Sequence, residues 1–147
     1  MNRLPFVWVA LFELKKLGLE DQGLQESIVR ILGPYVRAGI ENKALLDQRS
    51  LLDQPKEDVF LACEIASIFY EETSCSIDLE SIKASNLEMD GIKLKGANLK
   101  YADLQGADLG TAKNLTAEQL LKARIDDSTK LDPDLRAEYE RLKAEQQ

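Results

Sequence analysis

The sequence predicts an α+β protein in which a helical N-terminal part leads into a solenoid of short repeats, followed by C-terminal helices. Before about residue 75, apolar residues recur at spacings of three and four, as they do on one face of an α-helix. From Ile77 the apolar spacing changes to five and holds for eight units, which matches neither a helix nor a strand. The expected domains are therefore a helical subdomain (1–75), a repeat segment (76–115) and a C-terminal capping helix with a charged tail helix (116–147).

Three helices are expected before the repeats. The first ends at Gly18 and follows the apolar positions Leu4, Val7, Trp8, Leu11 and Leu14. The second covers residues 24–36, where Gly33-Pro34 predicts a kink or two short helices because proline has no N–H to donate. Residues 38–54 lose clear periodicity and predict a loop or a weak helix. The third helix begins at Pro55 and is apolar on two sides, which is typical of a helix buried between neighbours.

Two apolar columns run through the repeats and are expected to face the interior. The first column is Ile77, Ile82, Leu87, Ile92, Ala97, Ala102, Ala107 and Ala112, and the second is Leu79, Ala84, Met89, Leu94, Leu99, Leu104 and Leu109. Within a unit the order apolar, polar, apolar indicates extended chain, because side chains two residues apart point the same way. The polar or glycine residues that follow must then turn the chain. Four such bends close a square, which predicts four units to a coil and two coils in all.

The units IKLKG, ANLKY, ADLQG and ADLGT resemble the pentapeptide-repeat family, whose pattern is A(D/N)Lxx. This resemblance implies a right-handed quadrilateral β-helix with the central Leu and the small residue two before it facing inward. The helical half, through WVALFELKKLGLED and SIVRILGPYVR, is similar to a segment found before the repeats in many bacterial members. Since the first coil carries Ile and Leu where the family prefers small residues, we expect the N-terminal helices to cap a wider first coil.

The C-terminal part is expected to close the other end of the solenoid. Thr116 and Gln119 fit a capping box for a short helix over residues 116–124. Asp132-Pro133 then starts a last, strongly charged helix. The acidic residues Asp126-Asp127 lack the spacing of a calcium-binding loop and are interpreted as loop or capping residues.

No catalytic site is indicated. The chain has no histidine, which removes the commonest general base and most zinc sites, and neither GxGxxG nor GxxxxGK(S/T) is present. Cys63 is predicted to be a buried thiol and Cys75 to be partly exposed, with no CxxC pattern. We therefore predict no enzymatic activity, no cofactor and no metal ion, in a reduced, cytoplasmic protein.

The composition also limits the partners. A net charge of −7 is unfavourable for non-specific nucleic-acid binding, so no nucleic acid is expected. No apolar run approaches the roughly 20 residues of a membrane span. The sequence predicts a non-catalytic protein-protein interaction or scaffold module, whose partner and oligomeric state it does not specify. Candidate contact residues are Lys93, Lys95 and Lys113, which share one face of the solenoid, and the exposed aromatic Tyr101. Lysines on such a face also serve simply to block edge pairing.

Three alternatives stay open. The repeats can serve only to stabilise the helical part, which would then carry the recognition. Alternatively, since some family members mimic DNA, the chain is an inhibitor or regulator of a topoisomerase such as gyrase. Two coils at the strand spacing of about 4.8 Å make a rod that is short for a DNA mimic. Its surface charge is also mixed, because the acidic face with Glu88, Asp90 and Asp108 adjoins the lysine face. In the third alternative, the chain is the soluble part of a membrane-associated pentapeptide-repeat protein.

Overall fold

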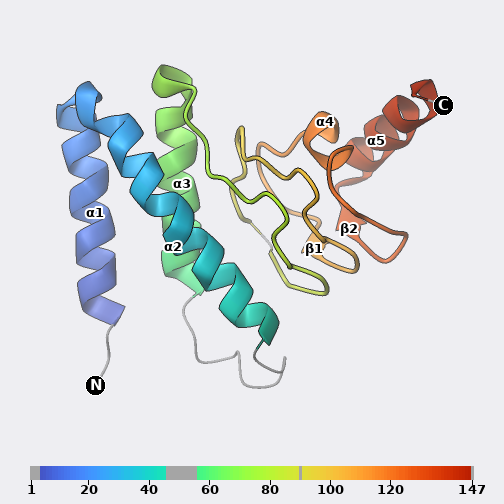
Figure 1. The fold of residues 1–147 in the computed structure, drawn as a ribbon, viewed down its shortest axis with the longest axis horizontal. Coiled ribbons are helices and arrows are strands. Elements are labelled where there is room, and N and C mark those ends of the chain that lie inside the picture. The colour runs from blue at the N-terminus through green and yellow to red at the C-terminus, as the bar shows by residue number, and fades with distance from the viewer. Residues whose placement is uncertain (1–3, 46–55, 90, 147) are drawn as a thin grey trace.

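The computed structural model describes residues 4–45, 56–89 and 91–146 and shows helices at both ends of the repeats. Before the repeats lie the helices α1 (Leu4–Glu20), α2 (Gln25–Leu45) and α3 (Lys56–Thr73), with the 3-10 turn η1 (Gln22–Leu24) between the first two. After the repeat segment come α4 (Ala117–Leu120) and α5 (Pro133–Glu145), and the strands β1 (Asp108–Leu109) and β2 (Lys130–Leu131). Figure 1 shows α1 at one extreme of the molecule, α5 at the other and the repeats between them. The architecture is thus α+β, with one continuous apolar core from Leu11 to Tyr139.

Helix α2 differs from its prediction in two ways. It passes through Pro34 as one helix, so the alternative of two short helices was wrong. It also continues to residue 45, so of the loop or weak helix expected from residue 38, the helical alternative holds over residues 38–45. The physical reason is a buried stripe that spans the proline: Val29, Leu32, Val36 and Ile40. Packing of this stripe outweighs the one hydrogen bond that Pro34 removes. Residues 46–55, with Pro55, lie outside the described part of the chain.

Helix α1 runs two residues past its expected end at Gly18. Gly18 is buried, and a Cβ at this position would overlap the ring of Phe69 on α3. This glycine therefore allows two helices to approach closely rather than ending the first one. Of the predicted α1 stripe, Leu11 is buried and Val7 and Leu14 pack against the core, while the side chains of Leu4 and Trp8 lie outside the described part.

The repeats stack on themselves every 20 residues. Parallel bridges join Asp78 to Asn98, Lys83 to Asp103, Glu88 to Asp108, and Lys93 to Lys113. We call residues 77–96 the first layer and residues 97–116 the second layer. Hydrogen bonds run both ways between them: the Leu79 N–H donates to the Asn98 carbonyl over 2.9 Å, and the Asn98 N–H donates to the Ile77 carbonyl over 3.0 Å. Four units therefore return the chain to the same side.

Each unit turns at its fifth residue. The fifth residues of six successive units have φ values from 58° to 76°, the left-handed region: Ser81, Asn86, Gly91, Gly96, Tyr101 and Gly106. In the next part of the chain the positive φ moves to Asn114, which marks the end of the regular pattern. Inside the turns, both predicted columns are buried except Ala112, which is half-buried.

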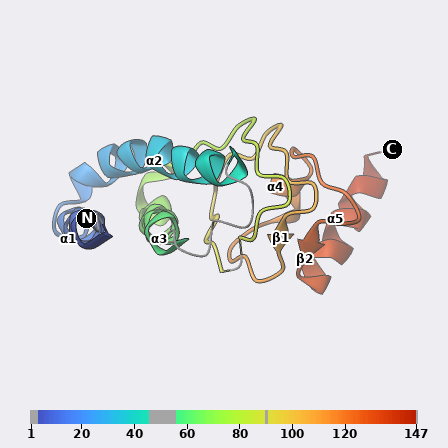
Figure 2. The ribbon, with the colours of Figure 1, turned by 90° about the horizontal axis from the view of Figure 1, so that it is seen from below.

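Helices α2 and α3 cover the free edge of the first layer (Figures 1 and 2). Arg37 of α2 donates through Nη2 to the Glu80 carbonyl over 2.7 Å and to the Asp78 carbonyl over 3.4 Å. On α3, the Tyr70 ring lies against Gly96, where a Cβ would overlap it. An uncovered edge of backbone groups would offer a template for aggregation, which this helical layer prevents.

The C-terminal part continues the stacking beyond the second layer, which the sequence did not predict. The Tyr101 N–H donates to Lys122 O over 2.7 Å, and the Lys130 N–H donates to Ala107 O over 2.9 Å. Strands β1 and β2 pair in parallel in the same way, with Asp108 opposite Lys130. We call residues 122–131 the partial third layer. Its offsets of 21 and 22 residues break the period of five, which explains why the pattern was missed.

At this end of the repeats, both predicted helix starts are present, but the first helix is shorter than expected. The capping box of Thr116 and Gln119 is present, but α4 spans only four residues. The helix expected over residues 116–124 is thus too long, and the partial third layer covers much of the surface assigned to it. Helix α5 begins at Pro133 with Asp132 as its N-cap, as predicted. It packs behind the partial third layer through the buried Tyr139 and the partly buried Leu135 and Leu142.

Candidate functional site

Two of the three predicted contact lysines are engaged within the chain. Lys93 Nζ lies 3.2 Å from Glu64 Oε2, and Lys95 forms an ion pair with Glu71, both glutamates being on α3. Lys93 and Lys113 lie opposite each other in adjacent layers, as the shared face requires, and Lys113 is exposed. Lys93 and Lys95 therefore fasten the first layer to the helical layer, which weakens the case for a partner at this face.

Glu64 of α3 forms ion pairs with two lysines, one on α1 and one in the first layer. Its Oε1 atom lies 3.2 Å from Lys15 Nζ of α1, while its other oxygen accepts from Lys93. The hydrogen bond from Lys93, with a smaller contribution from Lys15, holds the pKa of Glu64 below its ordinary value, against the opposing effect of desolvation. One carboxylate thus joins α1, α3 and the first layer.

Tyr101 is exposed, as predicted, at 61%. It occupies a left-handed turn position with φ of 60°, where a bulky side chain is uncommon and strained. Lys100 Nζ lies 4.9 Å from the centre of its ring. The role of Tyr101 as a contact residue stays a prediction.

The acidic face is partly neutralised. Glu88 and Asp108 lie opposite each other in adjacent layers, and Lys130 Nζ lies 2.6 Å from Asp108 Oδ2. Asp90 lies outside the described residues. Among the described residues of this face, Lys130 therefore interrupts the acidic side chains at Asp108.

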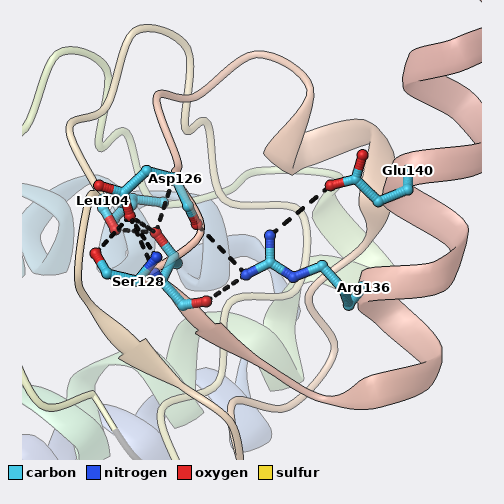
Figure 3. A network of polar contacts seen from close by, with 6 residues as sticks. Leu104, Asp126, Ser128, Arg136 and Glu140 are labelled. Carbon is cyan, nitrogen blue, oxygen red and sulfur yellow. Dashed lines mark hydrogen bonds and ion pairs between the residues drawn. The ribbon is translucent and has the colours of Figure 1, made fainter.

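A polar network around Asp126 holds the partial third layer in place (Figure 3). Its Oδ1 atom accepts from the Ser128 hydroxyl over 2.6 Å and from the Gly106 N–H of the second layer over 3.2 Å. These bonds, with the Ser128 contribution largest, lower the pKa of Asp126. The buried Thr129 Oγ1 lies 3.0 Å from the Leu104 carbonyl and 3.1 Å from Asp126 Oδ1.

Arg136 extends this network to α5. Its guanidinium donates to the Thr129 carbonyl and lies 3.9 Å from Glu140. Sequence reasoning assigned Asp126 only a loop or capping role. The available signal was the segment DDST, since Asp, Ser and Thr bond readily to nearby backbone groups. The network thus joins the second layer, the partial third layer and α5.

Comparison with known families agrees with the layer geometry. Residues 77–113 match the family model "Pentapeptide repeats" in eight copies. These residues belong to the pentapeptide-repeat family. No curated protein and no solved structure matches the chain. The pentapeptide repeats account for the first layer and most of the second, whereas α1–α3 and the partial third layer lie outside the match.

The two cysteines of the chain are Cys63 and Cys75. Cys63 is buried on α3, and burial raises the pKa of its thiol to about 12, so the nucleophilic thiolate is not populated near neutral pH. Cys75 is half-buried, and both cysteines are free thiols. In the described part of the chain, no three His, Cys, Asp or Glu residues are grouped to hold a metal ion. Among these residues there is also no helix of the length and apolarity that a membrane crossing requires.

Three exposed apolar side chains of α1 form a stripe along the helix. Val9, Phe12 and Leu19 are each exposed by 60–62%, and the exposed Lys16 lies between the last two. A shallow hollow of approximately 350 Å³ lies among Phe12, Lys16 and Leu19. The spacing of three, four and three places these four side chains along one side of the helix. We call this set the outer stripe.

Proposed function

We propose that this pentapeptide-repeat protein is a non-catalytic protein-binding module, in which the helical layer carries recognition and the repeats support it. The observation that carries the proposal is the outer stripe of α1. Internal ion pairs hold Lys93, Lys95, Asp103 and Asp108 of the repeats, so these side chains offer less to a partner. We also infer that the two layers form a right-handed quadrilateral β-helix. The 20-residue bridges and the left-handed residue at each fifth position support this inference.

Helix α1 has two apolar sides but neighbours on only one. Its inner side, with Val7, Leu11 and Leu14, packs on the core. Its outer stripe faces away from α2 and α3, and Figure 1 shows α1 at the edge of the molecule. A helix that is apolar on two sides is normally buried between two neighbours. The second neighbour of α1 is therefore expected to come from a partner.

The outer stripe favours a helix of a different protein as the partner. Its spacing is that of the a and d positions of a coiled coil, with Lys16 at an a position. Parallel pairing with a second copy would place Lys16 against Lys16, and antiparallel pairing would place it against Phe12 or Leu19. Both arrangements place the Lys16 ammonium group against like charge or apolar side chains, with Glu20 of the same helix, 4.0 Å away, as its ion-pair partner. An amphipathic partner helix with a carboxylate opposite Lys16 satisfies the whole stripe.

Site-specific photocrosslinking in the native cell tests this assignment. A photoreactive benzoylphenylalanine replaces Phe12 in the full chain. A matched control places it at Ile31 on α2, which is equally exposed at 62%. We expect position 12 to crosslink to a discrete protein, at a segment with amphipathic helical spacing and an acidic residue, and position 31 not to do so. Crosslinking that is absent at position 12, or identical at both positions, would refute the proposal.

A charge-reversal experiment separates this proposal from the lysine-face alternative. In the double variant Lys93→Glu and Lys95→Glu, the partner crosslinked at position 12 is expected to remain bound as long as the variant is folded. Circular dichroism confirms folding before the assay. Loss of the partner from a folded double variant, with retention in Phe12→Glu, would move the binding site from α1 to the lysine face.

A further inference from the structure

We propose that a hollow beside the second layer binds an extended acidic peptide segment of a partner protein. The hollow has a volume of approximately 560 Å³, within the usual range for ligand pockets of about 300–1,000 Å³. It lies between the repeats, α3 and α4, and its lining includes Tyr70, Lys95, Leu99, Asn114, Gln119 and Lys122. The site contains no residue of the outer stripe, so it is independent of the function proposed for α1.

One backbone N–H beside the hollow lacks a hydrogen-bond acceptor among the described residues. In the first layer, the N–H groups of the central residues donate to the next layer: Leu79, Ala84, Met89 and Leu94. In the second layer, Leu104 does the same, to Arg124 O over 2.9 Å. Leu99 is equivalent to Leu79 in the 20-residue repeat, yet its N–H has no acceptor among the residues that the structure describes. Helix α4 stands where the partial third layer would otherwise pass.

Two backbone carbonyls at this edge, in contrast, already accept hydrogen bonds. Gln119 of α4 donates through Nε2 to the carbonyls of Leu94 and Ala97, each over 2.9 Å. Its amide oxygen accepts from the Thr116 N–H in the capping box, so its orientation is fixed. These two carbonyls are therefore satisfied, while the Leu99 N–H, in a residue only 2% exposed, has no partner among the described residues. A ligand that brings an oxygen acceptor would satisfy this N–H.

The charge of the lining also favours an acidic ligand. The chain carries a net charge of −7, yet among the described residues that line this hollow two are lysines and none carries a carboxylate. Lys95 is paired with Glu71, whereas the exposed Lys122 has no ion pair among the described residues. An extended segment would place a backbone carbonyl on the Leu99 N–H and an Asp or Glu side chain on Lys122. The addition of an extended segment to an open backbone edge is an established mode of peptide recognition.

Nuclear magnetic resonance titration of the ¹⁵N-labelled full chain tests this site. The probe is acetyl-Glu-Thr-Glu-Thr-Glu-amide, and the control is the same peptide with Gln in place of Glu. We expect the acidic peptide to shift the amide resonances of Leu99 and Asn114 in a saturable manner. The affinity of the neutral peptide is expected to be lower by a factor of about ten or more, because this peptide cannot form a charge-assisted hydrogen bond.

Two variants make the test specific. Lys122→Gln is expected to weaken binding of the acidic peptide about tenfold, as expected for removal of one charged hydrogen-bond partner. Lys83→Gln, at an exposed lysine on another side of the first layer, is expected to leave binding unchanged. The proposal is overturned if the acidic peptide causes no saturable shift at Leu99. It is also overturned if the neutral peptide binds equally well, or if Lys122→Gln and Lys83→Gln behave alike.

Discussion

Replacement of Glu64 by glutamine tests whether one carboxylate holds the helical layer on the repeats. The variant keeps the shape of the side chain but removes the charge that faces Lys15 and Lys93, each at 3.2 Å. Hydrogen bonds to charged groups contribute about 1.5–3 kcal/mol each when well buried. The side chains here are 26–34% exposed, and exposed pairs contribute about 0–1 kcal/mol. We therefore expect a total loss of about 1–2 kcal/mol in the free energy of unfolding at pH 7.

Urea denaturation at several pH values gives the measurement. Because the pKa of Glu64 is lowered in the folded state, its contribution is present above the unfolded pKa of about 4.3 and is lost as the pH falls through the folded pKa. The difference between the wild type and Glu64→Gln should thus shrink in acid. Glu71→Gln is the matched control, since Glu71 is 62% exposed and should contribute little. A loss that is the same at pH 3 and pH 7, or equal in the two variants, would contradict this account.

Three further predictions concern the repeats and their surface. Leu99→Lys places a charge in the buried column and should cost several kcal/mol, about 3 or more, in unfolding free energy; a melting temperature like that of the wild type would show that the column does not face inward. Thr129→Val removes the hydroxyl near the Leu104 carbonyl and should cost about 1–3 kcal/mol, measured by urea denaturation with Ser128→Ala as a comparison. In a gyrase supercoiling assay, the chain at micromolar concentration should not inhibit, because Lys130 interrupts the acidic face at Asp108; inhibition would restore DNA mimicry.

The repeat layers were the most predictable part of the fold. Each unit specifies its own geometry, because a buried residue at the first and third positions and a turn at the fifth are local requirements. The period of five therefore predicted which side chains are buried, from Ile77 to Leu109. The capping box at Thr116 and the N-cap at Asp132 were likewise local signals. The division into three domains stays a prediction. One continuous apolar core runs through all three segments.

What the sequence did not predict depends on contacts between distant residues. Pro34 disfavours a helix locally, but the buried stripe from Val29 to Ile40 outweighs it. The spacing of Lys93 and Lys95 predicts that both lie on the surface of the repeats. The sequence around them does not predict their ion pairs with Glu64 and Glu71. The partial third layer was missed because its residues follow no period. In each case the deciding partner is 20 or more residues away or lies across a helix–helix contact.

The regular turns have a consequence for how such a chain changes length during evolution. Since four units return the backbone to the same side, each unit rotates the path by about a quarter turn. Insertion of a single unit would rotate α5 by that amount relative to α1–α3. Insertion of four units would instead move the two ends apart by one strand spacing of about 4.8 Å without changing their relative orientation. The number of repeats therefore sets the angle between the two helical ends in steps, while blocks of four adjust only the distance.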